Sequence, residues 1–385
     1  MRHNPDAQRP RKLFIVAGEA SGDTYGAALV RELRAREPGL RVSGLGGPEM
    51  ACAGVELMQD LVTHAVMGVA GLLENIGGLL RAYRTITHRL SVEPPDAIIL
   101  IDFPEFNLVT AKHAKRVGVP VVYYVSPQVW AWRTGRVRKI AERVRKMLCL
   151  FEFEKEMYER AGMDVTHVGH PLLDTMADKL AVTDRGAVRR SLGLPESGTV
   201  VGLLPGSRRK EIHHVFPILL ESAERMRREA GDLVFVTGAA PTLDPALFRK
   251  IAARYRIEPN LVRGRAHDVM LASDLLLICS GTATLEAGLL GVPMVVTYQA
   301  DLPSYLIFGS LITPGHFALA NIVAGERIVP ELYMADAKPS RIATAALELL
   351  HGKLDETRRR LGIIREKLGP PGASARAAEE ILRIL

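Results

Sequence analysis

The chain has 385 residues, of which 48% are apolar and 24% charged, and its formal net charge is +7. This length predicts two domains, and this composition excludes a disordered chain and a membrane-embedded one. Three widely spaced cysteines, Cys52, Cys149 and Cys279, exclude a disulfide scaffold and indicate a reducing compartment. The apolar run 13–17 is too short for a signal peptide, and no stretch reaches the roughly 18 apolar residues that span a bilayer. We therefore expect a cytoplasmic protein.

Short apolar runs alternate along the chain with longer amphipathic segments. Because these runs are apolar throughout, they predict parallel strands covered by helices on both faces. The expected strands are 13–17, 97–101, 121–125, 147–150 and 165–168 in the first half, and 200–204, 233–237, 275–279 and 294–297 in the second. Helical spacing is clear in 27–36, 219–229 and 283–290.

These patterns predict an α/β fold with two doubly wound Rossmann-like domains that face a cleft. The first domain is expected at 11–180 and the second at 191–345, with 177–196 as the linker candidate. Helices in 346–385 are expected to pack back toward the first domain.

Polar and glycine-rich residues follow the expected strands of the first half, at the edge where doubly wound sheets bind ligands. Asp102 ends one strand just before Pro104, where it can act as a general base or cap the next helix. Glu19 and Asp23 flank a tight turn and can bind hydroxyls or a metal, or simply close the turn. Candidates for the acceptor or the cleft are Glu19, Ser21, Gly22, Asp23, Ser126, Gln128, Trp130 and His170.

Two clusters in the second half point to a phosphate-containing ligand. Gly206, Ser207 and Arg208 follow a strand, where a glycine lets an oxyanion approach free N–H groups and an arginine offers paired donors. Ser280, Gly281 and Thr282 follow the expected strand 275–279 and precede the expected helix 283–290. Glu286 lies further in, where it can accept hydrogen bonds from a ribose diol. The alternative for both clusters is a capped helix start with solvated charges.

Positive charge and apolar side chains concentrate in two segments of the first half. Residues 133–146 hold seven basic residues against Glu142 alone. Residues 65–80 are mainly apolar, although Glu74 interrupts them, and the candidates for membrane contact are Val66, Met67, Val69, Leu72 and Leu73. Together the two segments predict a domain that rests on an anionic lipid surface without crossing it. The alternatives are a solvated helix and a core helix. Nucleic acid is not expected as a partner, because no basic strand is interleaved with aromatic residues.

Several strings in the chain are specific enough to identify a family. They are Gly18-Glu19-Ala20-Ser21-Gly22-Asp23, Gly46-Gly47-Pro48-Glu49-Met50, Ile101-Asp102-Phe103-Pro104-Glu105-Phe106-Asn107, Ser126-Pro127-Gln128-Val129-Trp130-Ala131-Trp132-Arg133, Gly169-His170-Pro171, Leu204-Pro205-Gly206-Ser207-Arg208 and Ser280-Gly281-Thr282. In this order they resemble the motifs of the lipid-A-disaccharide synthases. Gln299 departs from the pattern, since an arginine is common at that position.

The resemblance implies an inverting, B-type glycosyltransferase that needs no metal or other cofactor. Its substrates would be UDP-2,3-diacylglucosamine and 2,3-diacylglucosamine 1-phosphate, and its products the β-1,6-linked lipid A disaccharide 1-phosphate and UDP. The base would be Asp102, and the enzyme would work at the inner face of the cytoplasmic membrane. The UDP contacts would be Gly206, Ser207, Arg208, Ser280, Gly281, Thr282, Glu286 and Asn321. A diverged paralogue acting on another UDP-sugar, a UDP-sugar-binding protein without turnover, and a homodimer are left open.

Overall fold

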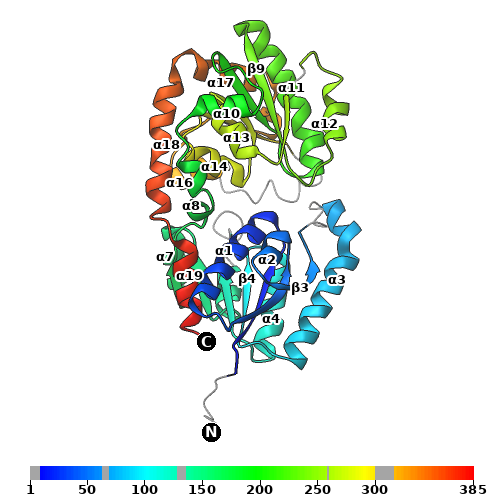
Figure 1. Cartoon of the computed structure of the whole chain (residues 1–385), viewed down its shortest axis with the longest axis vertical. Helices are drawn as coiled ribbons and strands as arrows, with labels where there is room; N and C mark the ends of the chain where they lie inside the picture. Colours follow the sequence, from blue (N-terminus) through cyan, green and yellow to red (C-terminus); the bar gives the residue numbers. More distant parts are fainter. Residues whose placement is uncertain (1–8, 63–68, 128–135, 258–259, 300–315) are drawn as a thin grey trace. The chain divides into compact units, whose positions relative to one another are not determined.

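The computed structural model describes residues 9–62, 69–127, 136–257, 260–299 and 316–385. These residues form two compact units, drawn in Figure 1. The first unit runs to Thr175 and also contains Gly369–Leu385, and the second is Met176–Leu368.

The first unit is a parallel sheet in the order β3-β2-β1-β4-β5-β6-β7. Its strands are β1 (Lys12–Ala17), β2 (Arg41–Gly46), β3 (Glu56–Asp60), β4 (Ala97–Ile101), β5 (Val121–Tyr124), β6 (Lys146–Cys149) and β7 (Val165–His167). One face packs on α3 (Val69–Val92), α4 (Pro104–Arg116), α6 (Arg136–Ala141) and α7 (Glu152–Glu159). The remaining helices are α1 (Ala20–Arg36), α2 (Pro48–Cys52), α8 (Leu172–Thr175) and α19 (Ala373–Leu382), and α1 contacts the other three.

The second unit repeats this plan with the order β10-β9-β8-β11-β12-β13. Its strands are β8 (Thr199–Leu204), β9 (Leu233–Ala239), β10 (Asn260–Arg263), β11 (Leu275–Cys279), β12 (Met294–Tyr298) and β13 (Glu331–Tyr333). One face packs on α11 (Arg209–Ala230), α12 (Pro245–Ala252) and α17 (Pro339–Glu348). The other helical elements are α9 (Ala177–Leu180), α10 (Arg185–Ser191), α13 (Ala266–Ala272), α14 (Thr282–Leu289), α16 (Leu319–Ala324), η2 (Met334–Asp336), η3 (Leu349–Lys353) and α18 (Leu354–Leu368).

The burial of each strand explains whether the apolar pattern of the sequence predicted it. The central strands β1, β4, β8 and β11 are buried almost throughout, as expected for strands covered on both faces. The expected strands are present, and the α/β prediction of two doubly wound, Rossmann-like sheets is confirmed. Four strands were not expected. Strands β2, β3, β10 and β13 lie at or next to a sheet edge and carry exposed or half-buried positions, which break the continuous apolar run.

The expected linker 177–196 is instead part of the second unit and contains α9 and α10. Arg189 is buried there, and its guanidinium donates to the carbonyls of Ala272, Glu196 and Gly198 and to the Asp274 carboxylate. A buried arginine with four partners anchors this segment to the second unit. The polar composition of the segment gave no sign of this anchor.

The C-terminal helix α19 belongs to the first unit and packs on α1. Glu380 of α19 lies 2.9 Å from Lys146 Nζ on β6, and Asp164 lies 2.6 Å from the same ammonium group. Arg376 donates to the carbonyl of Val168, and Asp174 accepts from the backbone N–H groups of Gly372 and Ser374. These contacts join α19 to both β6 and the segment after β7.

Candidate active site

Each sheet has a topological switch point, where connections leave a pair of neighbouring strands in opposite directions. The pairs are β1 with β4 in the first unit and β8 with β11 in the second. Ligands of doubly wound sheets bind beyond the carboxyl ends of such pairs. Gly18 and Asp102 follow the first pair, and Gly206 and Ser280 follow the second. The sequence motifs thus converge on the two edges where ligands are expected.

Asp102 lies at the turn from β4 into α4. Its φ is 45° and that of Phe103 is 48°, so two consecutive residues with side chains adopt the left-handed conformation. Val125, just after the neighbouring strand β5, is also left-handed with φ 65°. Backbone strain of this kind gathers at functional sites more often than elsewhere. It therefore marks the ends of β4 and β5 as the candidate catalytic edge of the first unit.

Asp23 has a structural role in the described contacts. Its side chain is 2% exposed, and the carboxylate accepts from the backbone N–H groups of Gly47, Glu49 and Met50 at 2.9–3.0 Å. It therefore caps the start of α2 and fixes the turn after β2. Glu19 is the residue before α1, and Ser21 and Gly22 lie in the first turn of that helix.

Ser126 and His170 are buried in the framework of the first unit. The hydroxyl of Ser126 donates to Glu154 at 2.5 Å, and the other Glu154 oxygen accepts from the N–H groups of Leu150 and Phe151. His170 Nδ1 accepts from the N–H of Leu172, and burial lowers the pKa of His170 to about 3. His170 is thus a neutral side chain. Gln128 and Trp130 lie outside the described residues.

In the loop after β8, backbone N–H groups that were expected to be free for an anion already have a partner. One carboxylate oxygen of Glu211 accepts from the N–H groups of Ser207 and Arg208, at 2.9 and 3.1 Å. The other lies 3.3 Å from the Arg208 guanidinium, whose side chain is 41% exposed. Gly206 is required here, because its φ is +116° and a Cβ would lie 2.3 Å from Glu211 Oε2. Glu211 thus takes the backbone donors and holds Arg208 at the sheet edge.

In α14, the helix after β11, Glu286 has a partner that no sequence pattern indicates. His267 Nε2 of α13 lies 3.0 Å from Glu286 Oε2 of α14, and both side chains are partly exposed. Ser280 Oγ donates to the carbonyl of Phe317 at 3.2 Å, and Gly281 precedes Thr282, the first residue of α14. A histidine near the start of a helix carries no pattern that points to an acid nineteen positions later.

Asn321 is completely buried, and its amide is bonded to the second unit itself. The oxygen accepts from the N–H groups of Ile328 and Val329, while the nitrogen donates to the carbonyl of Val329 and to Glu331. Glu331 also accepts from the N–H groups of Phe317 and Ala318. In the described contacts Asn321 therefore supports the segment beside Ser280.

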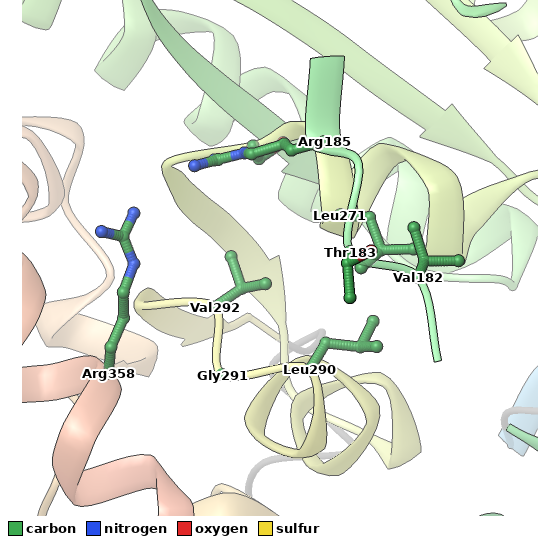
Figure 2. A pocket seen from close by; sticks show the side chains of 9 residues that line it. Val182, Thr183, Arg185, Leu271, Leu290, Gly291, Val292 and Arg358 are labelled. Carbon is green, nitrogen blue, oxygen red and sulfur yellow. The ribbon is translucent and has the colours of Figure 1, made fainter. Parts of the chain in front are cut away.

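A cavity of about 220 Å³ in the second unit is distinct from this edge (Figure 2). Arg185 and Arg358 line it together with apolar side chains, among them Leu271 and Val292. Val292 lies just before β12 and Ser273, another lining residue, just before β11. The cavity is therefore at the amino ends of the strands, opposite the edge where Ser280 and Gly206 lie.

A basic face covers part of the first unit. We use this term for Lys112, Lys115, Arg116, Arg138, Lys139 and Arg145, all of them exposed. Lys115 donates to the carbonyl of Glu142, and Arg143 donates to that of Leu108, so α4 and the segment around α6 lie side by side. Three cations of the expected segment have acidic partners. Arg136 pairs with Glu105, Lys146 pairs with Asp164 and Glu380, and Arg138 of the basic face lies 3.7 Å from Glu142. Arg133 is outside the described residues.

The apolar segment 65–80 is only partly described. Val66 and Met67 are outside the described residues, and Val69, Leu72 and Leu73 lie in α3 with undescribed side chains. Further along, Leu80 of α3 is 49% exposed, as is Val109 of the neighbouring α4. No helix in the described ranges is both long and apolar enough to cross a bilayer. Those ranges also contain no group of three or more His, Cys, Asp or Glu side chains that could hold a metal ion.

Comparison with known proteins gives consistent matches along the chain. Residues 13–370 match the family model described as lipid-A-disaccharide synthetase. The lipid-A-disaccharide synthase of Geobacter sulfurreducens is 43% identical over 376 residues, which covers 97% of each chain. That of Geobacter metallireducens is 44% identical over 377 residues, again 97% of each. A solved UDP-GlcNAc 2-epimerase from Neisseria meningitidis, bound to UDP-GlcNAc, has a TM-score of 0.66 at 15% identity and covers 97% of this chain and all of its own. This last likeness shows the shared fold.

Proposed function

The chain belongs to the lipid-A-disaccharide synthetase family, and from this premise we propose which of its residues carry out the reaction. It is a glycosyltransferase that joins UDP-2,3-diacylglucosamine to 2,3-diacylglucosamine 1-phosphate, forming the lipid A disaccharide 1-phosphate and releasing UDP. The observation that carries this conclusion is the identity of 43–44% over 97% of the chain. The family motifs at both switch points agree with it.

Asp102 is the general base in this proposal. Inversion requires a single displacement: the acceptor 6-hydroxyl attacks the anomeric carbon while the bond from that carbon to the diphosphate breaks. The hydroxyl proton passes to a carboxylate, and the electron pair of the broken bond leaves with UDP. Support comes from the strained turn at the end of β4, which holds Asp102 at a ligand-binding edge.

Arg208 and Glu286 hold the donor in this proposal. The diphosphate carries the negative charge that grows as the anomeric bond breaks, and a guanidinium is suited to it by charge and by its planar donors. Glu211 orients Arg208 by its 3.3 Å contact. Glu286, held by His267, accepts from the ribose hydroxyls, and Ser280 and Thr282 lie at the same sheet edge. Because Gln299 lacks the positive charge that is common in the family, Arg208 carries a larger share of the charge compensation.

In this proposal the first unit binds to an anionic lipid surface. Both sugar substrates bear acyl chains, and each methylene contributes about 0.8 kcal/mol to residence in a bilayer, so the enzyme must meet them at the membrane. The basic face supplies cations that anionic lipid attracts by about 1 kcal/mol each near the surface. Exposed Leu80 and Val109 add apolar contact on the adjoining α3 and α4.

Two variants test the roles of the two edges. Asp102→Asn keeps the size of the side chain and removes its basicity, so kcat should fall about 10²–10⁴-fold while UDP affinity is retained. Arg208→Ala should lower turnover about 10²–10³-fold and weaken UDP binding. Disaccharide formation is measured by mass spectrometry, and UDP affinity by calorimetry. Near-normal turnover in Asp102→Asn would remove the base assignment. UDP binding without release of UDP from any acylated donor, in the unmodified chain, would instead favour a binding protein.

A further inference from the structure

The turn that carries Asp102 has an unusual conformation for its residue types. Strand β4 ends at Ile101, α4 begins at Pro104, and the two residues between them are both left-handed. A side chain with a Cβ disfavours this region, and only surrounding contacts can maintain two such residues in succession. A sharp strand-to-helix turn of this kind presents its side chain at the edge of the sheet, as the nucleophile turn of α/β-hydrolases does.

Two buried side chains bind the carbonyl of Asp102. The hydroxyl of Tyr123, on the neighbouring strand β5, donates to it at 2.5 Å. Nδ2 of Asn107, in the first turns of α4, donates to the same carbonyl at 2.8 Å and to that of Ile101 at 3.1 Å. Tyr123 and Asn107 are both 0% exposed, so water cannot readily replace either bond.

The ring of Phe103, the next residue of the turn, is held by packing. The ring of Phe103 lies over Gly18, where a Cβ would meet its Cδ1 at 2.3 Å. The same ring stacks on Phe106 with centroids 5.4 Å apart. The peptide N–H of Asp102 donates to the carbonyl of Tyr124 at 3.1 Å. The left-handed pair is therefore fixed by Gly18 after β1, by β5 and by α4.

We infer that Tyr123 and Asn107 are positioning residues for the transferase reaction, because they clamp the Asp102 carbonyl and so set the direction of its carboxylate. The inference rests on the proposed role of Asp102 as the base. Neither side chain is assigned a contact with substrate. Their effect passes through the backbone of one residue, and a misplacement of about 1 Å at a reacting group can cost about 10²-fold in rate.

Tyr123→Phe removes one clamp hydrogen bond and keeps the packing of the ring. We expect kcat to fall about 10–100-fold, with the KM of each substrate changed less than about twofold. The matched control is Tyr124→Phe, on the same strand and equally buried. Its side chain points to the opposite face of the sheet, and among the described residues its hydroxyl makes no hydrogen bond to the Asp102 turn. The control should leave kcat within about twofold of the unmodified enzyme.

A second measurement separates positioning from a general loss of structure. In an Asp102→Asn background, adding Tyr123→Phe should have little further effect on the remaining rate, because no base is left to aim. Three results would each overturn the inference. The first is that Tyr123→Phe lowers kcat in the Asp102→Asn variant by the same factor as in the unmodified enzyme. The others are an equal fall in kcat for Tyr124→Phe and an unchanged kcat in Tyr123→Phe. If Asp102→Asn alone keeps near-normal turnover, the proposed base fails, and that result is distinct from all three.

Discussion

Replacement of Asp23 by asparagine tests whether this residue serves the fold or the chemistry. The carboxylate accepts three backbone N–H groups, and one oxygen takes those of Gly47 and Met50 while the other takes that of Glu49. Asparagine can keep the first two bonds, without charge assistance, and must turn its NH₂ group toward the N–H of Glu49. One charge-assisted bond is worth about 1.5–3 kcal/mol, and weakening of the other two adds about 0.5–1 kcal/mol in total. The expected loss is therefore about 3 kcal/mol, which corresponds to about 6–12 °C in the melting temperature of a unit of this size.

The assay is thermal unfolding combined with hydrogen exchange read by mass spectrometry on peptides of β2 and α2. Exchange should accelerate in those peptides of the Asp23→Asn variant and stay unchanged in the second unit. Asp184→Asn is the matched control, because Asp184 caps α10 through one exposed bond to Ala187 and asparagine caps helices equally well. An Asp23→Asn variant that melts like the unmodified protein but has lost turnover would refute the structural role and favour contact of Asp23 with the acceptor.

Two further predictions concern pH and lipid. Burial lowers the pKa of His170 to about 3, below its value near 6.5 in an unfolded chain, so the unfolded state binds the extra proton between these values. Stability should consequently fall as the pH drops below 6.5, by about 2 kcal/mol at pH 5, and denaturant titrations should show a flatter dependence in His170→Gln. Flotation with anionic liposomes at low salt should be weakened by Lys139→Glu with Arg145→Glu on the basic face, and high salt should have the same effect on the unmodified protein. The control for flotation is a charge reversal of equal size on α12, Arg249→Glu with Lys250→Glu. If both double variants lose flotation equally, the protein is attracted to the liposomes by its net charge alone and not by the basic face.

Sequence patterns predicted the central strands and the polar, glycine-rich turns that follow them, because both follow from local rules. A strand buried on two faces is apolar in every position, as β4 and β11 are. Edge strands such as β3 and β10 are half exposed and carry no such run, so their pairing only becomes visible in three dimensions.

Polar residues were harder to assign than strands, because their partners are distant in the chain. Asp23 and Asn321 have the side chains of binding residues, yet both accept hydrogen bonds from backbone N–H groups. Those groups lie 24–27 positions after Asp23 and 7–8 positions after Asn321. Tyr123 lies in the middle of an apolar strand and gives no sign that its hydroxyl reaches Asp102. Glu211 was the exception. It stands three residues after Arg208 at a helix start, the spacing of a capping box, and could have been recognised as the group that takes the loop N–H donors.

The position of α19 has a consequence for the order in which the protein matures during synthesis. Most of the first unit is translated first, but its helix α19 is made only after the whole second unit. Until then, Lys146 lacks Glu380, and the side of α1 that packs on α19 faces water. Domains made early commonly fold while translation continues. Here the second unit can complete its sheet before the first is closed, so a nascent chain that stops short of residue 373 should present an exposed apolar face to chaperones and proteases.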